Sequence, residues 1–264
     1  MTTVTRRWKE PVGVRGALSE LDVADAGVWT ERLRFDRDRA DRNQSSELAA
    51  ITAAVEARSR EAGARALILS GSTARARRTP VSDLDYHVIG ERPQIGHHAE
   101  DIDLYRDDAE SFMAKLRSGD DLVHWSVWYG CVLFDDGVVQ SAAAYVASHD
   151  GWPDATRKLR QARRALDFTE RIVASADAGA AREQVRGILS LTARWLLLAH
   201  DVFPLSRDEL SDQVLDLGCF DLAAALHRSI HCEPRLDELA SGARLVRLLT
   251  GLSAARARRA RLHP

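Results

Sequence analysis

A glycine–serine turn and a pair of aspartates stand at a spacing that could hold a phosphate and a metal ion. Gly71 and Ser72 follow one apolar stretch, and the motif Asp83-Leu84-Asp85 leads into a second. Glycine lets the backbone turn sharply and lets a ligand approach it closely. A serine can cap a short helix over the polar segment 73–78, whose free N–H groups would face an anion. The pattern predicts a buried strand that ends in a phosphate-binding turn.

The two aspartates are expected to share a metal ion. Side chains alternate between the two faces of a strand, so Asp83 and Asp85 would project to the same face. Two carboxylates that close repel each other unless a cation lies between them. Mg²⁺ is the expected cation, because it takes hard oxygen ligands and commonly binds one or two carboxylates together with substrate phosphates. A solvated Asp-x-Asp pair at a strand start is the alternative.

The turn, the gap and the acidic pair resemble the signature of the nucleotidyltransferase superfamily of DNA polymerase beta. The specific match covers roughly residues 66–105, and residues 129–135 resemble a strand common in bacterial small-molecule nucleotidyltransferases. Members often read Gly-Ser-x-Ala-Arg-Gly; residues 71–75 fit, and Ala76 replaces the last glycine. The resemblance implies an α+β nucleotidyltransferase fold, a small mixed sheet with helices, followed by an all-helical C-terminal domain.

The resemblance also implies a third acid on a neighbouring strand. Asp103 lies between Ile102 and Leu104, which is the family's pattern for that residue. Asp101 would share the face of Asp103 in a strand, and we expect it to be a solvated charge at the strand end.

The implied chemistry is attack by an acceptor hydroxyl on the α-phosphorus of ATP or another nucleoside triphosphate, with release of pyrophosphate. Asp83, Asp85 and Asp103 would hold two Mg²⁺ ions that stabilise the attacking and leaving oxygens. Asp103 would also accept the hydroxyl proton.

Four residues are candidates for contact with the nucleotide phosphates. Gly71 and Ser72, with nearby backbone N–H groups, would bind the β- and γ-phosphates. Arg75 and Lys158 could add positive charge, and for each of them an ordinary solvated helix side chain is the alternative.

The expected acceptor is a small hydroxylated molecule of the aminoglycoside kind. A protein or tRNA acceptor, as in toxin–antitoxin nucleotidyltransferases, is the second reading, and a non-catalytic nucleotide-binding regulator is the third. Arg194 and His200 resemble the ribonuclease motif of HEPN-type helical domains. A six-residue step places them on different faces of a regular helix, which argues against RNA cleavage. His97 and His98 are adjacent loop residues and are expected to be solvated.

The chain is expected to divide into three parts. Residues 1–45 are predicted to be an irregular, charged arm that docks partly through Trp8, Trp29 and Phe35. Residues 46–150 would form the catalytic domain and residues 151–264 a helical bundle, since strand signals vanish after Gly151. Ligand sites favour domain interfaces, so the acceptor is expected at this junction, and the nearby tryptophans would either line its site or fill the core. They are Trp125, Trp128 and Trp152.

Periodicity assigns the elements in more detail. A helix should begin at Ser46, with Ser45 or Ser46 as its cap, and should stop at Gly63. Residues 107–117 form the next predicted helix, the aromatic and β-branched run 123–135 ends in a core strand, and four helical stretches follow. These begin at Leu159, Val185, Arg207 and Ala243.

Composition limits the class of protein. A net charge of −2 over 264 residues gives no general attraction to nucleic acid, and 45% apolar residues suffice for a packed core. Three cysteines without a paired motif suggest a reducing compartment. No signal peptide or membrane-spanning stretch is apparent, so a cytoplasmic location is expected.

Overall fold

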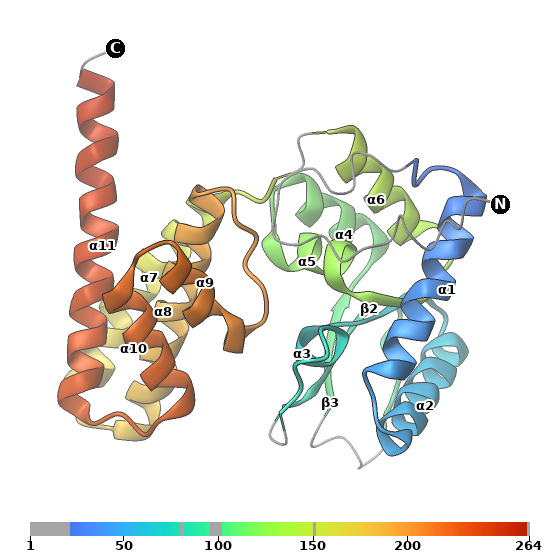
Figure 1. The fold of residues 1–264 in the computed structure, drawn as a ribbon, viewed down its shortest axis with the longest axis horizontal. Coiled ribbons are helices and arrows are strands. Elements are labelled where there is room, and N and C mark those ends of the chain that lie inside the picture. Colours follow the sequence, from blue (N-terminus) through green and yellow to red (C-terminus); the bar gives the residue numbers. More distant parts are fainter. Residues whose placement is uncertain (1–21, 80–81, 96–101, 150–151, 263–264) are drawn as a thin grey trace. The chain divides into compact units, whose positions relative to one another are not determined.

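The computed structural model describes residues 22–79, 82–95, 102–149 and 152–262, with residues 252–262 as backbone only. The chain divides into two compact units, Met1–Pro153 and Asp154–Pro264. The first unit combines a mixed sheet with helices, and the second is helical, which confirms the α+β fold class (Figure 1). Trp8, Pro80, the His97–His98 pair, Asp101 and Gly151 lie outside the described residues.

The first unit contains, in chain order, α1 (Ala26–Arg42), α2 (Ser46–Ala62), β1 (Ala64–Leu69), α3 (Gly71–Ala74), β2 (Leu84–Gly90), β3 (Ile102–Asp107), α4 (Ala109–Arg117), α5 (Asp121–Tyr129), β4 (Cys131–Asp135) and α6 (Val138–Ser148). The sheet order is β3-β2-β1-β4. Strand β1 pairs antiparallel with β2 and β4, whereas β2 and β3 run parallel. The predicted strands around the motif are therefore confirmed, and β3 lies at a sheet edge.

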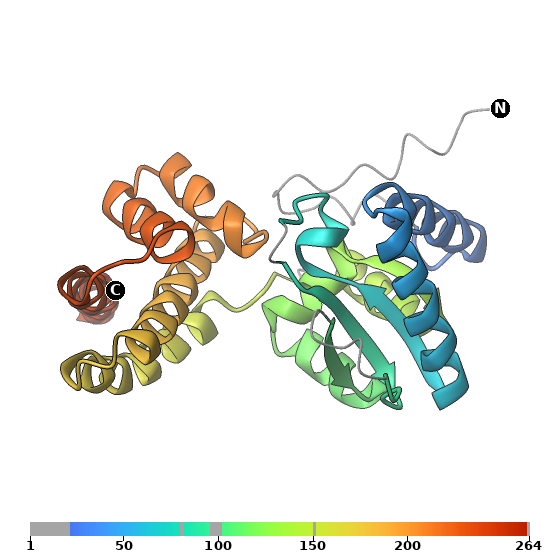
Figure 2. The same cartoon turned by 90° about the horizontal axis from the view of Figure 1, so that it is seen from below.

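Neighbouring residues of β2 show which helices cover each face of the sheet. The hydroxyl of Tyr86 lies 2.7 Å from that of Thr52 on α2. His87 points the other way and contacts Ser126 of α5. Helix α2 therefore covers one face, while α5, with the neighbouring α4, covers the other (Figure 2).

Helix α2 has the predicted limits. The Ser45 side chain accepts a hydrogen bond from the backbone N–H of Leu48, and Gly63 ends the helix with φ of +88°. Serine is a favoured N-cap and glycine tolerates the left-handed conformation at a C-cap, so both ends follow from the sequence.

The first 45 residues are not an irregular arm throughout, because residues Ala26–Arg42 form α1 and pack against β4. The sequence prediction was wrong here, since the charges of this segment are partly internal. Arg32 and Arg39 are buried around Asp36, and both donate to backbone carbonyls at the end of α5. Trp29 is also buried, as expected of a docked segment.

The run of aromatic and β-branched residues at 123–135 divides into two elements. Residues up to Tyr129 belong to α5, and only Cys131–Asp135 form a strand. Asp120 caps α5 by accepting from the N–H groups of Leu122 and Val123. Local β propensity is overridden here by packing, since almost every side chain of α5 is buried.

The second unit consists of α7 (Ala155–Ala174), α8 (Ala178–Ala199), the short helix η3 (Arg207–Glu209), α9 (Leu210–Asp216), α10 (Phe220–His231) and α11 (Leu236–Leu262). One apolar cluster, which includes Leu166 of α7, Val185 and Leu189 of α8 and Leu226 of α10, joins these helices. The helical character of this half is as predicted. Within the described segments, none of the helices is both long enough and apolar enough to cross a membrane.

Candidate active site

The Gly-Ser turn is tied directly to the strand that carries the acidic motif. The backbone N–H of Ser70 donates to the carbonyl of Asp85 at 2.8 Å. Gly71 follows with φ of +64°, a conformation that favours glycine. The turn at the end of β1 therefore lies beside the first residues of β2.

Ser72 does not cap a helix over residues 73–78. Helix α3 begins two residues earlier than predicted and covers only Gly71–Ala74, with Ser70 at the cap position. The chain leaves the helix through Ala76, whose φ is +55°. A left-handed conformation is strained for a residue that has a Cβ atom, so Ala76 lies where glycine would be more comfortable. The Ser72 carbonyl accepts from the N–H groups of Arg75 and Arg77 and closes the turn.

Two hydroxyl groups flank the turn. Ser70 Oγ and Thr73 Oγ1 are buried, and neither has a hydrogen-bond partner within the described part of the chain. A buried hydroxyl without a partner costs free energy. Their position on either side of Gly71 and Ser72 fits a turn that accommodates a polar ligand.

Gly71 and Asp85 are in very close contact. A Cβ atom added to Gly71 would lie 1.9 Å from Oδ2 and 2.8 Å from Cγ of Asp85. No side chain could occupy that position without displacing the carboxylate. The contact brings the predicted phosphate-binding turn and one predicted metal ligand to the same place.

Asp85 and Asp103 occupy matching positions on the parallel pair β2 and β3. Matched residues on neighbouring strands project to the same face, so the two carboxylates stand side by side at the start of both strands. Asp83 precedes β2, and its side chain is exposed, as is that of Asp103, whereas Asp85 is half-buried. The roles assigned to these aspartates stay predictions.

The acidic residues fit a divalent cation in two respects, the chemistry of their oxygen atoms and their positions on the strands. Carboxylate oxygens are the ligands that Mg²⁺ prefers, and Asp85 and Asp103 are adjacent on the sheet. Over the described residues, no three or more His, Cys, Asp or Glu side chains are gathered into a metal-binding group. Asp85, Asp103 and Asp83, together with oxygens of a bound substrate, stay the predicted ligands of a cation.

The two basic candidates lie in different units. The guanidinium of Arg75 lies 5.3 Å from the centre of the Tyr129 ring, which places it over an aromatic face of the first unit. Lys158 is half-buried on α7 of the second unit. Their contact with phosphate stays a prediction.

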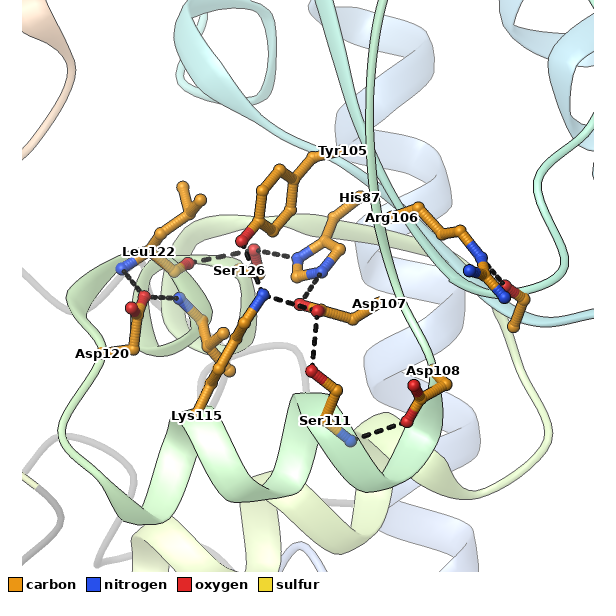
Figure 3. A network of polar contacts seen from close by, with 12 residues as sticks. His87, Tyr105, Arg106, Asp107, Asp108, Ser111, Lys115, Asp120, Leu122 and Ser126 are labelled. Atoms are coloured by element: carbon orange, nitrogen blue, oxygen red, sulfur yellow. Dashed lines mark hydrogen bonds and ion pairs between the residues drawn. The ribbon is translucent and has the colours of Figure 1, made fainter.

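Beyond the acidic pair, the same face of the sheet carries a buried polar network that the sequence analysis missed (Figure 3). His87 of β2 contacts Ser126 Oγ through Nδ1 at 3.0 Å and Asp107 Oδ2 through Nε2 at 3.2 Å. Lys115 of α4 donates to Asp107 Oδ1 at 2.5 Å and to the Tyr105 hydroxyl at 2.8 Å. The available signal was the polar residue His87 within an apolar strand, two positions after Asp85.

Hydrogen bonds and nearby charges in this network favour the charged forms of Asp107 and Lys115. Burial alone would raise the pKa of Asp107, but hydrogen bonds from His87 and Lys115 outweigh it and hold that pKa below its ordinary value. For Lys115, burial opposes the charged form, and the bonds to Asp107 and Tyr105 raise its pKa nonetheless. Asp107 and Lys115 are therefore an ion pair at neutral pH.

His87 contacts both Ser126 and Asp107, and these are the residue types of a hydrolase triad. The serine, however, is not accessible as it is in such a triad. Ser126 is fully buried, and its hydroxyl also donates to the Leu122 carbonyl. A nucleophile must reach its substrate. The network is therefore a structural part of the sheet.

The other sequence candidates do not gather into a site. Arg194 lies within α8 and donates to the Leu205 carbonyl, whereas His200 is exposed at the C-cap of that helix. Trp125 and Trp128 are buried on α5, and the Trp128 ring lies 5.6 Å from that of Trp152. These two buried tryptophans fill the core of the first unit.

No family model matches this sequence, and no curated protein matches it either. A solved structure described as a nucleotidyltransferase-like protein from Exiguobacterium sibiricum is similar over 73% of this chain and 70% of its own, with 16% identity and a TM-score of 0.38.

Proposed function

We propose that this chain is a Mg²⁺-dependent nucleotidyltransferase that moves a nucleoside monophosphate, with ATP as the expected donor, onto a hydroxyl group. The observation that carries the proposal is the contact between Gly71 and Asp85, where an added Cβ would meet the carboxylate at 1.9 Å. A phosphate on the turn and a cation on the carboxylate would then be neighbours. That is the arrangement which nucleotidyl transfer needs.

The proposed roles of the residues, in binding phosphate or a cation, follow from their positions. The backbone at Gly71 and the hydroxyls of Ser70, Ser72 and Thr73 would bind the β- and γ-phosphates, because two of these hydroxyls are buried without partners in the described chain. Asp85 would orient the bound triphosphate through the cation. Mg²⁺, when bound, would supply charge stabilisation to the attacking and leaving oxygens.

The proposed reaction forms one bond and breaks one. The acceptor oxygen bonds to the α-phosphorus, the bond from that phosphorus to the bridging oxygen breaks, and pyrophosphate leaves with the electron pair. The acceptor proton passes to the carboxylate of Asp103. This residue suits that role because it is solvent-exposed and lies opposite Asp85 in the strand register.

A small hydroxylated molecule of the aminoglycoside kind is the proposed acceptor. The net charge of −2 supports a small acceptor over a nucleic acid, because a long anionic polymer would find no general attraction. A protein or tRNA acceptor is an outcome that the experiment can distinguish.

The proposal is tested by transfer from α-labelled ATP, with Mg²⁺, to three separate acceptor pools: aminoglycosides, total tRNA and cytosolic proteins. We expect label in the aminoglycoside pool and release of pyrophosphate. The matched controls are Asp85→Asn, which should be inactive, and Glu91→Gln, an exposed acid just after β2 that should retain full activity. Label in tRNA or protein would identify that class of molecule as the acceptor in place of a small molecule. No labelling with any of the four nucleoside triphosphates would refute the proposal.

A further inference from the structure

Edge strand β3 is anchored by a charged residue. Of its six residues only Asp107 is buried, and the others are exposed or half-buried. Among the described residues, β3 pairs with β2 alone and is the last strand of the sheet. Register is strongly specified where a strand buries an apolar face and weakly specified where it does not. Apolar burial therefore gives β3 little preference for one register.

Asp107 makes specific contacts with two other elements. Its Oδ2 lies 3.2 Å from Nε2 of His87 on β2, and its Oδ1 accepts from Ser111 Oγ at 3.1 Å and from Lys115 Nζ at 2.5 Å on α4. The rings of Tyr105 and His87, which are opposite each other in the register, lie 4.8 Å apart. These contacts join β3 to its neighbouring strand and to α4.

The network lies in line with the proposed acidic site. Asp85 and His87 are two residues apart on β2, and Asp103 and Asp107 are four residues apart on β3. Side chains at even spacing share a face of the sheet. Asp107 and Asp103 therefore lie at different points along the same face of β3. A slip of β3 relative to β2 would displace both residues.

We propose that His87, Asp107 and Lys115 form a positioning network that fixes the register of β3 and thereby holds Asp103 opposite Asp85. The inference rests on the proposed function for the use of Asp103. It also accounts for the observed register, in which Asp103 lies opposite Asp85. A slip of two residues would keep every side chain on its face and bring position 101 opposite Asp85, and the buried contacts of Asp107 would be lost.

The test compares Asp107→Asn with Arg106→Gln. Arg106 also joins the two strands, since its Nε donates to the Gly90 carbonyl at 2.7 Å, but it is exposed. Lys115→Met is a second variant of the network that keeps an apolar stem of similar length, in case Asp107→Asn does not fold. Hydrogen exchange of the β3 amides and Mn²⁺ affinity by electron paramagnetic resonance are measured on the full chain.

Relative to the unmodified chain, we expect Asp107→Asn or Lys115→Met to accelerate hydrogen exchange more in β3 than in β1. Mn²⁺ affinity should be lower by about 10–100-fold, as for residues that orient metal ligands. Arg106→Gln should leave both unchanged. If the network acts through Asp103, adding either variant to Asp103→Ala should lower Mn²⁺ affinity no further than Asp103→Ala alone.

Three results would overturn the inference: equal acceleration in β1 and β3, unchanged exchange in β3, or losses of Mn²⁺ affinity that multiply in the double variant. Absence of nucleotidyl transfer by the unmodified chain, together with accelerated exchange in β3 of the variants, would refute the proposed function and leave the register anchor supported. Failure of the network and failure of the proposed function are therefore distinguishable.

Discussion

Gly71 lies so close to Asp85 that an added Cβ would come within 1.9 Å of the carboxylate oxygen Oδ2. The contact joins residues that are distant in sequence, and a backbone bond from Ser70 N–H to the Asp85 carbonyl holds them together. The position of the carboxylate therefore depends on the absence of a side chain at residue 71.

Replacement of Gly71 by alanine should abolish transfer and Mn²⁺ binding together. The methyl group would displace the Asp85 side chain, and a positive φ of +64° adds strain of about 1–2 kcal/mol for a residue with a Cβ. Gly63→Ala is the matched control. Its φ is +88° but nothing lies within 4 Å of the added Cβ, so it should cost similar stability and leave activity intact. Equal activity in Gly71→Ala and Gly63→Ala would contradict the proposed closeness of turn and carboxylate.

Asp85→Asn should remove detectable nucleotidyl transfer while the thermal unfolding midpoint changes little. The amide keeps the shape of the side chain but loses the charge that a cation requires. Asp83→Asn should be similarly inactive, because Asp83 is proposed to bind the same cation. Rates at saturating Mg²⁺ and circular dichroism spectra would decide, and turnover at the unmodified rate in either variant would refute the metal site.

Asp103→Ala should lower kcat by about 10²–10⁴-fold, the usual cost of losing a general base, with a small change in nucleotide KM. Asp101→Ala provides the comparison, because sequence alone leaves Asp101 as an alternative third acid. A steady-state comparison of the two variants, across pH 6 to 9, tests the assignment. A larger loss for Asp101→Ala would show that the acid was placed at the wrong strand position.

The elements around the motif could be predicted because local signals agree there. Apolar strands flank a Gly-Ser turn, Ser45 and Gly63 mark the ends of α2, and the acidic residues begin their strands. The spacing of the Gly71–Ser72 turn from Asp83 and Asp85 indicates the candidate site, and the family resemblance implies Asp103 as a third acid. The pairing of Asp85 with Asp103 then follows from a parallel register that no local pattern encodes.

Predictions failed where distant contacts decide the structure. The charges of α1 suggested an irregular arm that docks only in part, yet Asp36 is buried between two arginines that cap the end of α5. Partners about ninety-five residues away, such as Val127 for Arg32, cannot be read from local sequence. The polar network around His87 was missed for the same reason, since its members come from β2, β3, α4 and α5.

Asp107→Asn should reduce the free energy of unfolding at neutral pH, and the difference from the unmodified chain should shrink in acid. The pKa of Asp107 is lowered by its partners, so its contribution is present above its ordinary pKa of 3.8 and is lost as pH falls through the lower folded value. Urea unfolding at pH 7, 4.5 and 3 measures this, with the exposed Glu110→Gln as control. A difference that stayed constant down to pH 3 would contradict the ion pair.

Asp36→Asn should destabilise the first unit strongly. The carboxylate is fully buried, accepts from Arg32 Nε at 2.5 Å and from Val132 N–H at 3.1 Å, and lies 3.2 Å from a guanidinium nitrogen of Arg39. Removing its charge takes a buried counter-ion away from two buried guanidinium groups, and breaking a buried ion pair typically costs about 3–5 kcal/mol. Asp38→Asn is the matched control, because Asp38 lies on the same helix and is exposed. Urea unfolding followed by tryptophan fluorescence reports the change, since Trp29 lies on α1 and Trp125 and Trp128 lie on α5. An equal, small effect in both variants would show that α1 does not anchor the sheet through Asp36.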